Sequence, residues 1–379
     1  MNTQTLTKVP TEAIKIEETS PMEQADVTIV VVPRERFSYS RESLESIYQE
    51  TKYPFNLVYV DGGSPSYIQH YLEGKAQEKQ FKLIRINHYL SPNRARNIGL
   101  KEVKSKYVVF IDNDVIVKQG WLESLVKSAE KTDASVVGTL TCLDHPLHEV
   151  IHNGGGETYI KIKTNKDKVT RHGVQNSYLE GRRVHKIPEQ LHLIECDFVE
   201  FHCALVRREL FEKTGLLDEG LLSTREHIDL CMTAKQAGGT VYCDRQSIVT
   251  YVTGVNLDWA DITFFMLRWS DAWDMASFNR FREKWGLEED WYFEKRYYRL
   301  GRRRYRTLLR AVISRFPFKE RRNGFAEFLK AVERIVNGWL SDRYALKHDY
   351  ARHSLSLRKK QKVKETERFA PLVTSSVSG

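Results

Sequence analysis

Short apolar runs rich in β-branched residues alternate with amphipathic helical patterns along the first part of the chain. The runs read VTIVVV, NLVYVD, FKLIRIN and YVVFID, and helical patterns such as SRESLESIYQE separate them. Neighbouring parallel strands need a crossover connection of about a dozen residues, which a helix usually supplies. The alternation therefore predicts an α/β fold with a Rossmann-like, mixed but mainly parallel sheet and helices on both faces.

Changes in composition divide the chain into four parts. Residues 1–25 are polar without periodicity, and we expect them to be disordered. We predict an α/β domain over residues 26–255, in which a polar loop to about Pro188 follows the glycine-rich segment HNGGGETYIKIKTN. Residues 256–345 are aromatic-rich with helical periodicity, which predicts a helical C-terminal region. Residues 346–379 form a basic tail that we expect to be flexible.

The charge distribution and the cysteine content indicate in which cellular compartment the protein works and which partners it can bind. The net charge is +9, and residues 302–364 hold 19 Lys and Arg against 5 Asp and Glu, so this part carries +14 and the rest −5. Such a part either is a solvated helical face or contacts an anionic partner such as a lipid surface or a phosphorylated acceptor. The five cysteines form no C-x-x-C pair, and no apolar run approaches the roughly 20 residues that span a bilayer. We expect a cytoplasmic protein, at most peripheral on the inner face of the membrane.

Two carboxylates follow the run YVVFID. Asp112 and Asp114 flank Asn113, and the segment DGGSP beginning at Asp61 follows an earlier run in the same way. Ligands bind at the carboxyl ends of strands in such sheets. Alternate residues of an extended segment point to the same side, so Asp112 and Asp114 could share one cation. Oxygen donors suit Mg²⁺ or Mn²⁺ with a bridging diphosphate.

The order of these segments resembles the nucleotide-sugar half of the family 2 inverting glycosyltransferases, which have the GT-A fold. The likeness rests on VYVDGGS, NRARNIGL and YVVFIDNDVIVKQGWLESL, and extends over roughly residues 27–255. It implies that Asp61 contacts the nucleobase, that Ala95–Gly99 opens a helix beside the diphosphate, and that Asp112 and Asp114 bind ribose and a Mn²⁺ or Mg²⁺ ion. The donor-binding residues expected from it are Pro33, Arg34, Glu35, Asp61, Arg94, Arg96, Asn97, Asp112 and Asn113.

The downstream segment EHIDLCMTAKQAGG resembles the catalytic helix of the same family, with one departure. The family usually reads Glu-Asp-x-Asp, whereas this chain has His227 at the position of the carboxylate base. Either His227 or the adjacent Glu226 could accept the acceptor's proton, since imidazole titrates near neutral pH. Tyr251 stands near the position where many members carry a metal-binding histidine. The residues expected in the acceptor or donor-sugar pocket are Gly154, Gly155, Asp197 and Asp229.

The resemblance implies inverting transfer of a sugar from a nucleoside diphosphate sugar, with a UDP-sugar favoured, to a hydroxyl of a glycan or lipid-linked glycan in bacterial surface glycan synthesis. One alternative is a non-catalytic sugar-nucleotide-binding or scaffold protein that kept the fold. A remote alternative is a zinc peptidase, because residues 148–152 read HEVIH, which on a helix could hold zinc. The usual nucleic-acid-binding modules are missing from the sequence, and we expect no nucleic-acid partner.

Overall fold

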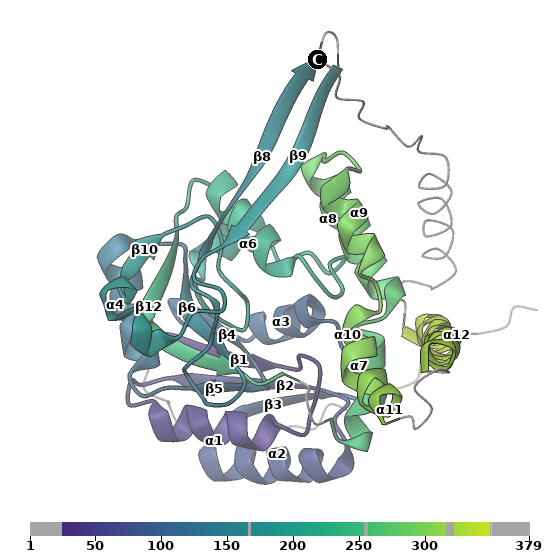
Figure 1. Cartoon of the computed structure of the whole chain (residues 1–379). Helices are drawn as coiled ribbons and strands as arrows, with labels where there is room; N and C mark the ends of the chain where they lie inside the picture. The colour runs from purple at the N-terminus through teal and green to yellow at the C-terminus, as the bar shows by residue number, and fades with distance from the viewer. Residues whose placement is uncertain (1–24, 166–167, 254–256, 316–321, 349, 351–379) are drawn as a thin grey trace, which may run out of the picture.

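One mixed sheet organises the chain (Figure 1). The computed structural model describes residues 25–165, 168–253, 257–315, 322–348 and 350. In these residues the main sheet has ten strands, eight of them in the order β10-β12-β6-β11-β4-β1-β2-β3, with β5 paired to β12 and β7 to β6. Their bounds are Val27–Val32 (β1), Asn56–Gly62 (β2), Lys82–Ile86 (β3), Tyr107–Asp112 (β4), Val115–Val117 (β5), Val136–Leu143 (β6), Ile151–Asn153 (β7), Leu193–Glu195 (β10), Cys203–Arg207 (β11) and Val241–Tyr251 (β12).

The pairing within this sheet is mainly parallel at its centre. Strands β3, β2, β1 and β4 run parallel to one another, and β6 and β12 form a second parallel pair. Strand β11 lies between the two groups and is antiparallel to both β4 and β6. The mixed, mainly parallel sheet predicted from the sequence is confirmed. The carboxyl ends of β1 and β4 therefore meet the beginning of β11 at one edge.

Helices bury both faces of the sheet. Alternate residues of β1 belong to different cores: Val30 and Val32 to one, Ile29 and Val31 to the other. Gly99 permits close packing on β1, because a Cβ there would lie 2.3 Å from a Val30 methyl carbon. Among the helices up to residue 236, α3 (Pro92–Leu100), α5 (Glu209–Thr214) and α6 (Glu226–Gln236) contribute to the first core, and α1 (Ser40–Glu50), α2 (Ser66–Lys79) and α4 (Trp121–Thr132) contribute to the second.

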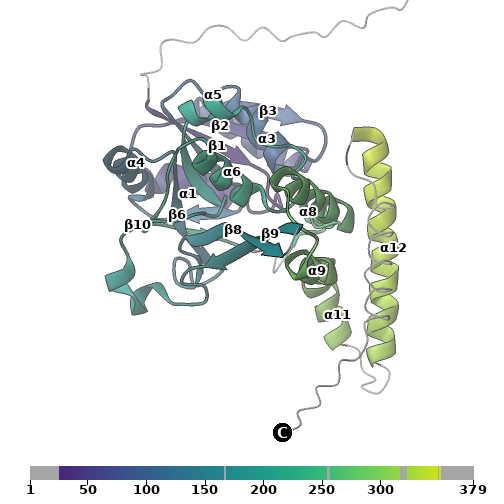
Figure 2. The same cartoon turned by 90° about the horizontal axis from the view of Figure 1, so that it is seen from above.

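The C-terminal region is helical, as predicted. Its helices lie along one side of the sheet domain, and Figure 2 shows α12 beside the others. None of the helices in the described ranges is long and apolar enough to cross a membrane. The predicted domain boundary at Val255 and almost all of the predicted tail fall outside the described residues. The elements are α7 (Trp259–Arg268), α8 (Asp271–Trp285), α9 (Trp291–Tyr298), α10 (Arg302–Arg304), the π-helical turn Tyr305–Leu309, α11 (Arg310–Ser314) and α12 (Arg322–His348).

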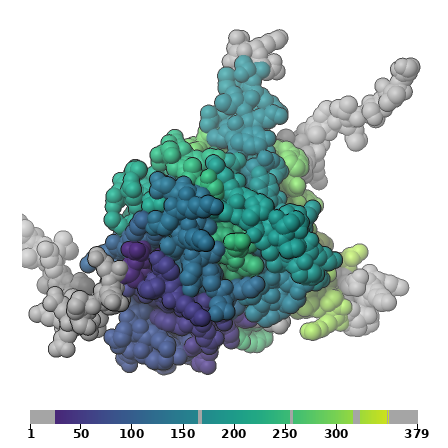
Figure 3. Space-filling view, turned by 90° about the vertical axis from the view of Figure 1, so that its left-hand side faces the viewer, coloured from purple at the N-terminus to yellow at the C-terminus, as the bar shows by residue number. Residues whose placement is uncertain are grey.

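A long hairpin replaces most of the polar loop expected before Pro188. Strands β8 (Gly156–Asn165) and β9 (Lys168–Ser177) pair with each other in a separate antiparallel sheet. They project from the body of the molecule, as the space-filling view shows (Figure 3). The expectation of a loop was wrong for β9, because β9 pairs along its length with β8, whose polar and apolar residues alternate in the strand period. Much of the apolar surface of β8 stays exposed, as at Ile162.

Candidate functional site

Asp112, at the end of β4, is enclosed by three basic side chains. Its Oδ1 accepts a hydrogen bond from Arg96 Nη2 at 3.0 Å. Its Oδ2 lies 3.0 Å from His202 Nδ1 and 3.5 Å from Arg34 Nε. The side chains of Asp112 and Arg96 are fully buried. Both oxygens of this carboxylate are thus engaged within the protein.

Asp114 has the opposite surroundings, although it is only two residues away. It lies in the turn between β4 and β5, and both of its oxygens are buried without a hydrogen-bond partner in the described part of the chain. Burial, together with the negative charges of Glu35 and Asp112, raises the pKa of Asp114 well above its ordinary value. The surroundings of Asp114 do not compensate the negative charge of an ionised carboxylate, and a bound cation would supply the compensating positive charge.

The first two residues of α6 face different surroundings. Glu226 Oε1 accepts hydrogen bonds from Arg34 Nη1 at 2.9 Å and from Arg268 Nη2 at 3.5 Å. Burial opposes ionisation of Glu226, but these guanidinium groups outweigh it and lower its pKa to about 2. His227 Nε2 lies 3.6 Å from Glu200 Oε1 and has no hydrogen-bond partner in the described ranges. Burial lowers the pKa of His227, so the imidazole is neutral near pH 7.

A cavity of about 970 Å³ opens between this edge of the sheet and the C-terminal helices. His152, Glu200, His202, His227 and Tyr251 line its inner side. Its walls carry far more arginine than acid, since only Asp144, Glu200 and Asp274 contribute carboxylates. The arginines that line it are Arg34, Arg225, Arg296, Arg299, Arg302, Arg303, Arg306 and Arg310.

Of the residues predicted to bind the donor, Arg34 lines this cavity, and Pro33, Glu35, Arg96, Asp112 and Asn113 lie in the buried layer around it. Glu35 accepts a hydrogen bond from Trp269 Nε1 at 2.6 Å and pairs with Arg303 at 3.0 Å. Asn113 Nδ2 donates to the Arg36 carbonyl and to Ser40 Oγ. These contacts tie the loop after β1 to the turn after β4.

Other predicted site residues lie apart from the cavity. Asp61 accepts hydrogen bonds from the backbone and hydroxyl of Ser64 and pairs with Arg85. Arg94 and Asn97 both bind Glu219. Four more engage other neighbours: Gly154 (carbonyl to Arg245), Gly155 (amide to Asn153), Asp197 (Lys235) and Asp229 (Lys284 and Trp285).

The sequence HEVIH does not form the helix that a zinc-peptidase motif needs. His148 has a φ of 62° and bonds to Thr250, whereas His152 belongs to strand β7. The two histidines therefore do not share a helical face, and the zinc-peptidase alternative loses its basis. Sequence reasoning also missed Glu200, His202 and the arginines of the C-terminal helices, because no short motif connects them.

Asp274 gives a prediction about stability at the cavity wall. It accepts a hydrogen bond from Ser223 and is half-buried, and burial raises its pKa to about 6 from an ordinary value of 3.8. The native state therefore binds this proton more tightly than the unfolded chain, and the resulting stabilisation is full below pH 3.8 and lost as the pH rises through about 6. We expect Asp274→Asn to raise the free energy of unfolding by about 1–2 kcal/mol at pH 7.5 and to leave it unchanged at pH 4. Urea denaturation at both pH values tests this, and an equal change at both would contradict it.

The sequence also matches known proteins. Residues 28–215 match the family described as glycosyl transferase family 2. Chondroitin synthase of Pasteurella multocida (strain Pm70) is 27% identical over 46% of this chain and 19% of its own length. Succinoglycan biosynthesis protein ExoW of Rhizobium meliloti (strain 1021) is 25% identical over 55% of this chain and 63% of its own length. The matched part is thus less than two thirds of either relative.

Among solved structures, GalNAc-T7 with UDP, GalNAc and Mn²⁺ aligns with a TM-score of 0.45 and 17% identity, covering 73% of this chain and 57% of that one. Staphylococcus aureus TarS aligns with a TM-score of 0.43 and 16% identity, covering 82% of this chain and 54% of that one.

Proposed function

Because the chain belongs to glycosyl transferase family 2 through residues 28–215, we propose that it transfers a sugar with inversion from a nucleoside diphosphate sugar to a hydroxyl group. The observation that carries the proposal is a cavity in which the imidazole of His227, whose pKa is lowered by burial, faces a wall of arginines. We favour a UDP-sugar as donor and a glycan or lipid-linked glycan of a bacterial surface polymer as acceptor. The printed names of the two bacterial relatives, a chondroitin synthase and a succinoglycan biosynthesis protein, support a role in polysaccharide synthesis.

His227 is the proposed general base. His227 lines the cavity and its buried Nε2 has no hydrogen-bond partner among the described residues, whereas Glu226 is held by two guanidinium groups and lies outside the lining. The imidazole takes the proton of the acceptor hydroxyl as the acceptor oxygen attacks the anomeric carbon. The bond from that carbon to the diphosphate breaks, and the diphosphate leaves with the bonding electrons. A single displacement of this kind inverts the anomeric centre.

The arginines that line the cavity can stabilise the negative charge of the leaving diphosphate. A diphosphate ester gains negative charge as it departs, and guanidinium groups bind phosphate oxygens in a bidentate manner. Arg299 and Arg306 line the cavity from the C-terminal region. We propose that side chains of this region bind the diphosphate against the edge of the sheet.

The residues present fit a divalent cation at Asp114 better than at Asp112. Both oxygens of Asp112 already contact basic side chains, those of Arg96, Arg34 and His202, whereas both oxygens of Asp114 lack a hydrogen-bond partner among the described residues. We propose that Asp114 is the carboxylate that would hold Mn²⁺ or Mg²⁺. Such an ion would be a Lewis acid close to Arg34, a residue that lines the cavity in which we propose that the diphosphate binds.

Helix α12 supports a peripheral contact with an anionic membrane. Several of its large apolar side chains are exposed, among them Phe328, Ile335 and Trp339, and Lys330, Arg334 and Arg343 belong to the same helix. An amphipathic helix of this composition can rest on an interface that carries negative lipids. We propose that it positions the enzyme beside a membrane-bound acceptor.

The proposed donor binding is tested by thermal shift with a panel of nucleoside diphosphate sugars. A ligand present at 100 times its Kd stabilises the native state by about 2.7 kcal/mol, so one donor should raise the Tm measurably. Arg306→Gln should reduce this shift, because it removes a cavity cation. Arg182→Gln is the matched control, since Arg182 is exposed and does not line the cavity. No shift with any donor, or equal shifts in both variants, would contradict the proposed binding site.

A further inference from the structure

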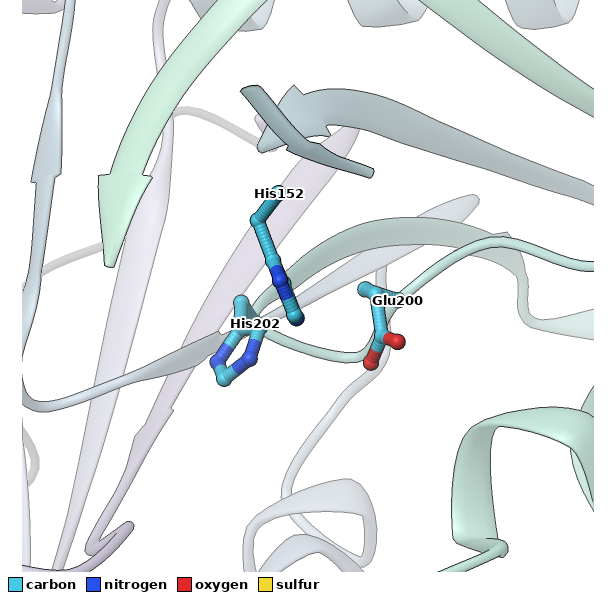
Figure 4. A group of neighbouring side chains, drawn as sticks. All are labelled: His152, Glu200 and His202. Atoms are coloured by element: carbon cyan, nitrogen blue, oxygen red, sulfur yellow. The ribbon is translucent and has the colours of Figure 1, made fainter. Parts of the chain in front are cut away.

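Three side chains from two segments lie close together (Figure 4), and all three line the cavity. His152 comes from β7, while Glu200 and His202 come from the segment that leads into β11. Each offers one ligand atom, a ring nitrogen or a carboxylate oxygen, and the three atoms lie within 4.8 Å of one another. Among the described residues this is the group of His, Cys, Asp and Glu side chains that meets such a distance.

We propose that His152, Glu200 and His202 bind a divalent transition-metal ion, with Zn²⁺ as the ion whose preferences they match best. Zn²⁺ takes imidazole nitrogen and carboxylate oxygen at about 2.0–2.2 Å, so its ligand atoms in a tetrahedral shell lie about 3.4 Å apart. Small side-chain rotations would bring the three atoms to that spacing. Mg²⁺ and Ca²⁺ prefer oxygen ligands throughout and match this set less well. The inference goes beyond the proposed function, because it concerns ion binding by the resting protein.

The surroundings of His202 are those of a metal-binding imidazole. Its Nδ1 donates to Asp112 Oδ2 at 3.0 Å, which leaves Nε2 as the ring nitrogen able to bind an ion. The Tyr251 ring stacks on the imidazole at 3.9 Å between centroids and holds its plane. Metal-binding histidines commonly donate their second nitrogen to a carboxylate in this way, which orients the ring and raises its basicity. Asp112 would then act through His202 and would not bind the ion itself.

The cluster has an open side. His152, Glu200 and His202 all line the cavity, so an ion with three protein ligands keeps at least one position for water or substrate. The open position distinguishes this site from a closed structural zinc site, in which four side chains surround the ion. Glu200 Oε1 also lies 3.6 Å from His227 Nε2, so the proposed ion would be close to the proposed base. A substrate oxygen bound to the ion would thus lie near that base.

The site is distinct from the one proposed at Asp114, which does not line the cavity. This separation allows a direct test by ion binding, without donor or acceptor. The chelator-treated full-length protein is titrated with Co²⁺ as a spectroscopic probe for Zn²⁺, and bound Zn²⁺ is counted after equilibrium dialysis. We expect one ion per chain and a visible Co²⁺ absorption band typical of nitrogen ligation.

Substitutions of individual side chains test which residues bind the ion. His152→Ala and Glu200→Gln should each weaken Zn²⁺ binding by more than the roughly 10–100-fold that loss of an outer hydrogen-bond partner costs. His185→Ala, which removes an exposed imidazole outside the cavity, and Asp114→Asn should both retain the ion and the band. Circular dichroism shows whether each variant is folded. No bound ion in the wild type, or an ion lost with Asp114→Asn and kept in His152→Ala, would overturn the proposal, and neither result depends on sugar transfer.

Discussion

His227→Ala is expected to lower the rate of sugar transfer by about 10²- to 10⁴-fold, the usual contribution of a general base. The imidazole is the titratable group of α6 that opens onto the cavity, and burial lowers its pKa so that it is neutral near pH 7. Donor affinity should change little, because the arginines that would bind the diphosphate stay in place. Initial rates at saturating donor, with donor binding measured by calorimetry, separate the two effects.

His192→Ala is the matched control for that variant. His192 is exposed and does not line the cavity, so its loss should leave the rate unchanged. A His227→Ala protein that keeps the wild-type rate would exclude the imidazole as base. A variant that loses donor affinity as strongly as rate would instead assign His227 to binding.

Asp112→Asn is expected to lower the free energy of unfolding by about 3–5 kcal/mol. Removing one partner of a buried ion pair leaves the opposite charge without compensation, and Asp112 faces the fully buried Arg96 as well as Arg34. Asparagine keeps the size of the side chain, so the change reports mainly on charge. Urea denaturation of the folded protein measures it.

Asp114→Asn is the control, because the same substitution two residues away removes a carboxylate without a hydrogen-bond partner in the described ranges. Burial and neighbouring carboxylates already raise the pKa of Asp114, so we expect this variant to be as stable as the wild type or more stable. Equal destabilisation by both substitutions would show that the two carboxylates are structurally equivalent and would contradict this account of their surroundings.

The sheet was predictable because its signals are local. The runs of β1, β2 and β4 are apolar enough to be buried on both faces, and the helices between the strands carry their own periodicity. The edge at which Asp112 lies follows from the rule for the carboxyl ends of parallel strands. The hairpin β8–β9 also had a local signal, since Ile160 and Ile162 alternate with lysines, but its polar composition favoured a loop.

The site was less predictable because its contacts join distant segments. Asp112 meets His202 only because β11 enters the sheet beside β4, an antiparallel insertion that no spacing in the sequence indicates. The same topology brings His152 to Glu200, 48 positions apart in the printed sequence. Residue types alone suggested that Asp112 and Asp114 act as a pair, whereas their neighbours give them different charge environments.

If residues of this cavity catalyse transfer from a nucleoside diphosphate sugar, the reaction releases nucleoside diphosphate, which can be measured. Wild-type protein is incubated with each nucleoside diphosphate sugar and with candidate glycan or lipid-linked acceptors, and the released nucleoside diphosphate is quantified. We predict that one donor, a UDP-sugar first among them, yields acceptor-dependent release in the wild type that His227→Ala reduces at least 100-fold. A donor that binds and raises the Tm, yet gives no acceptor-dependent release of nucleoside diphosphate by the wild type with any acceptor, would contradict sugar transfer and identify a sugar-nucleotide-binding protein.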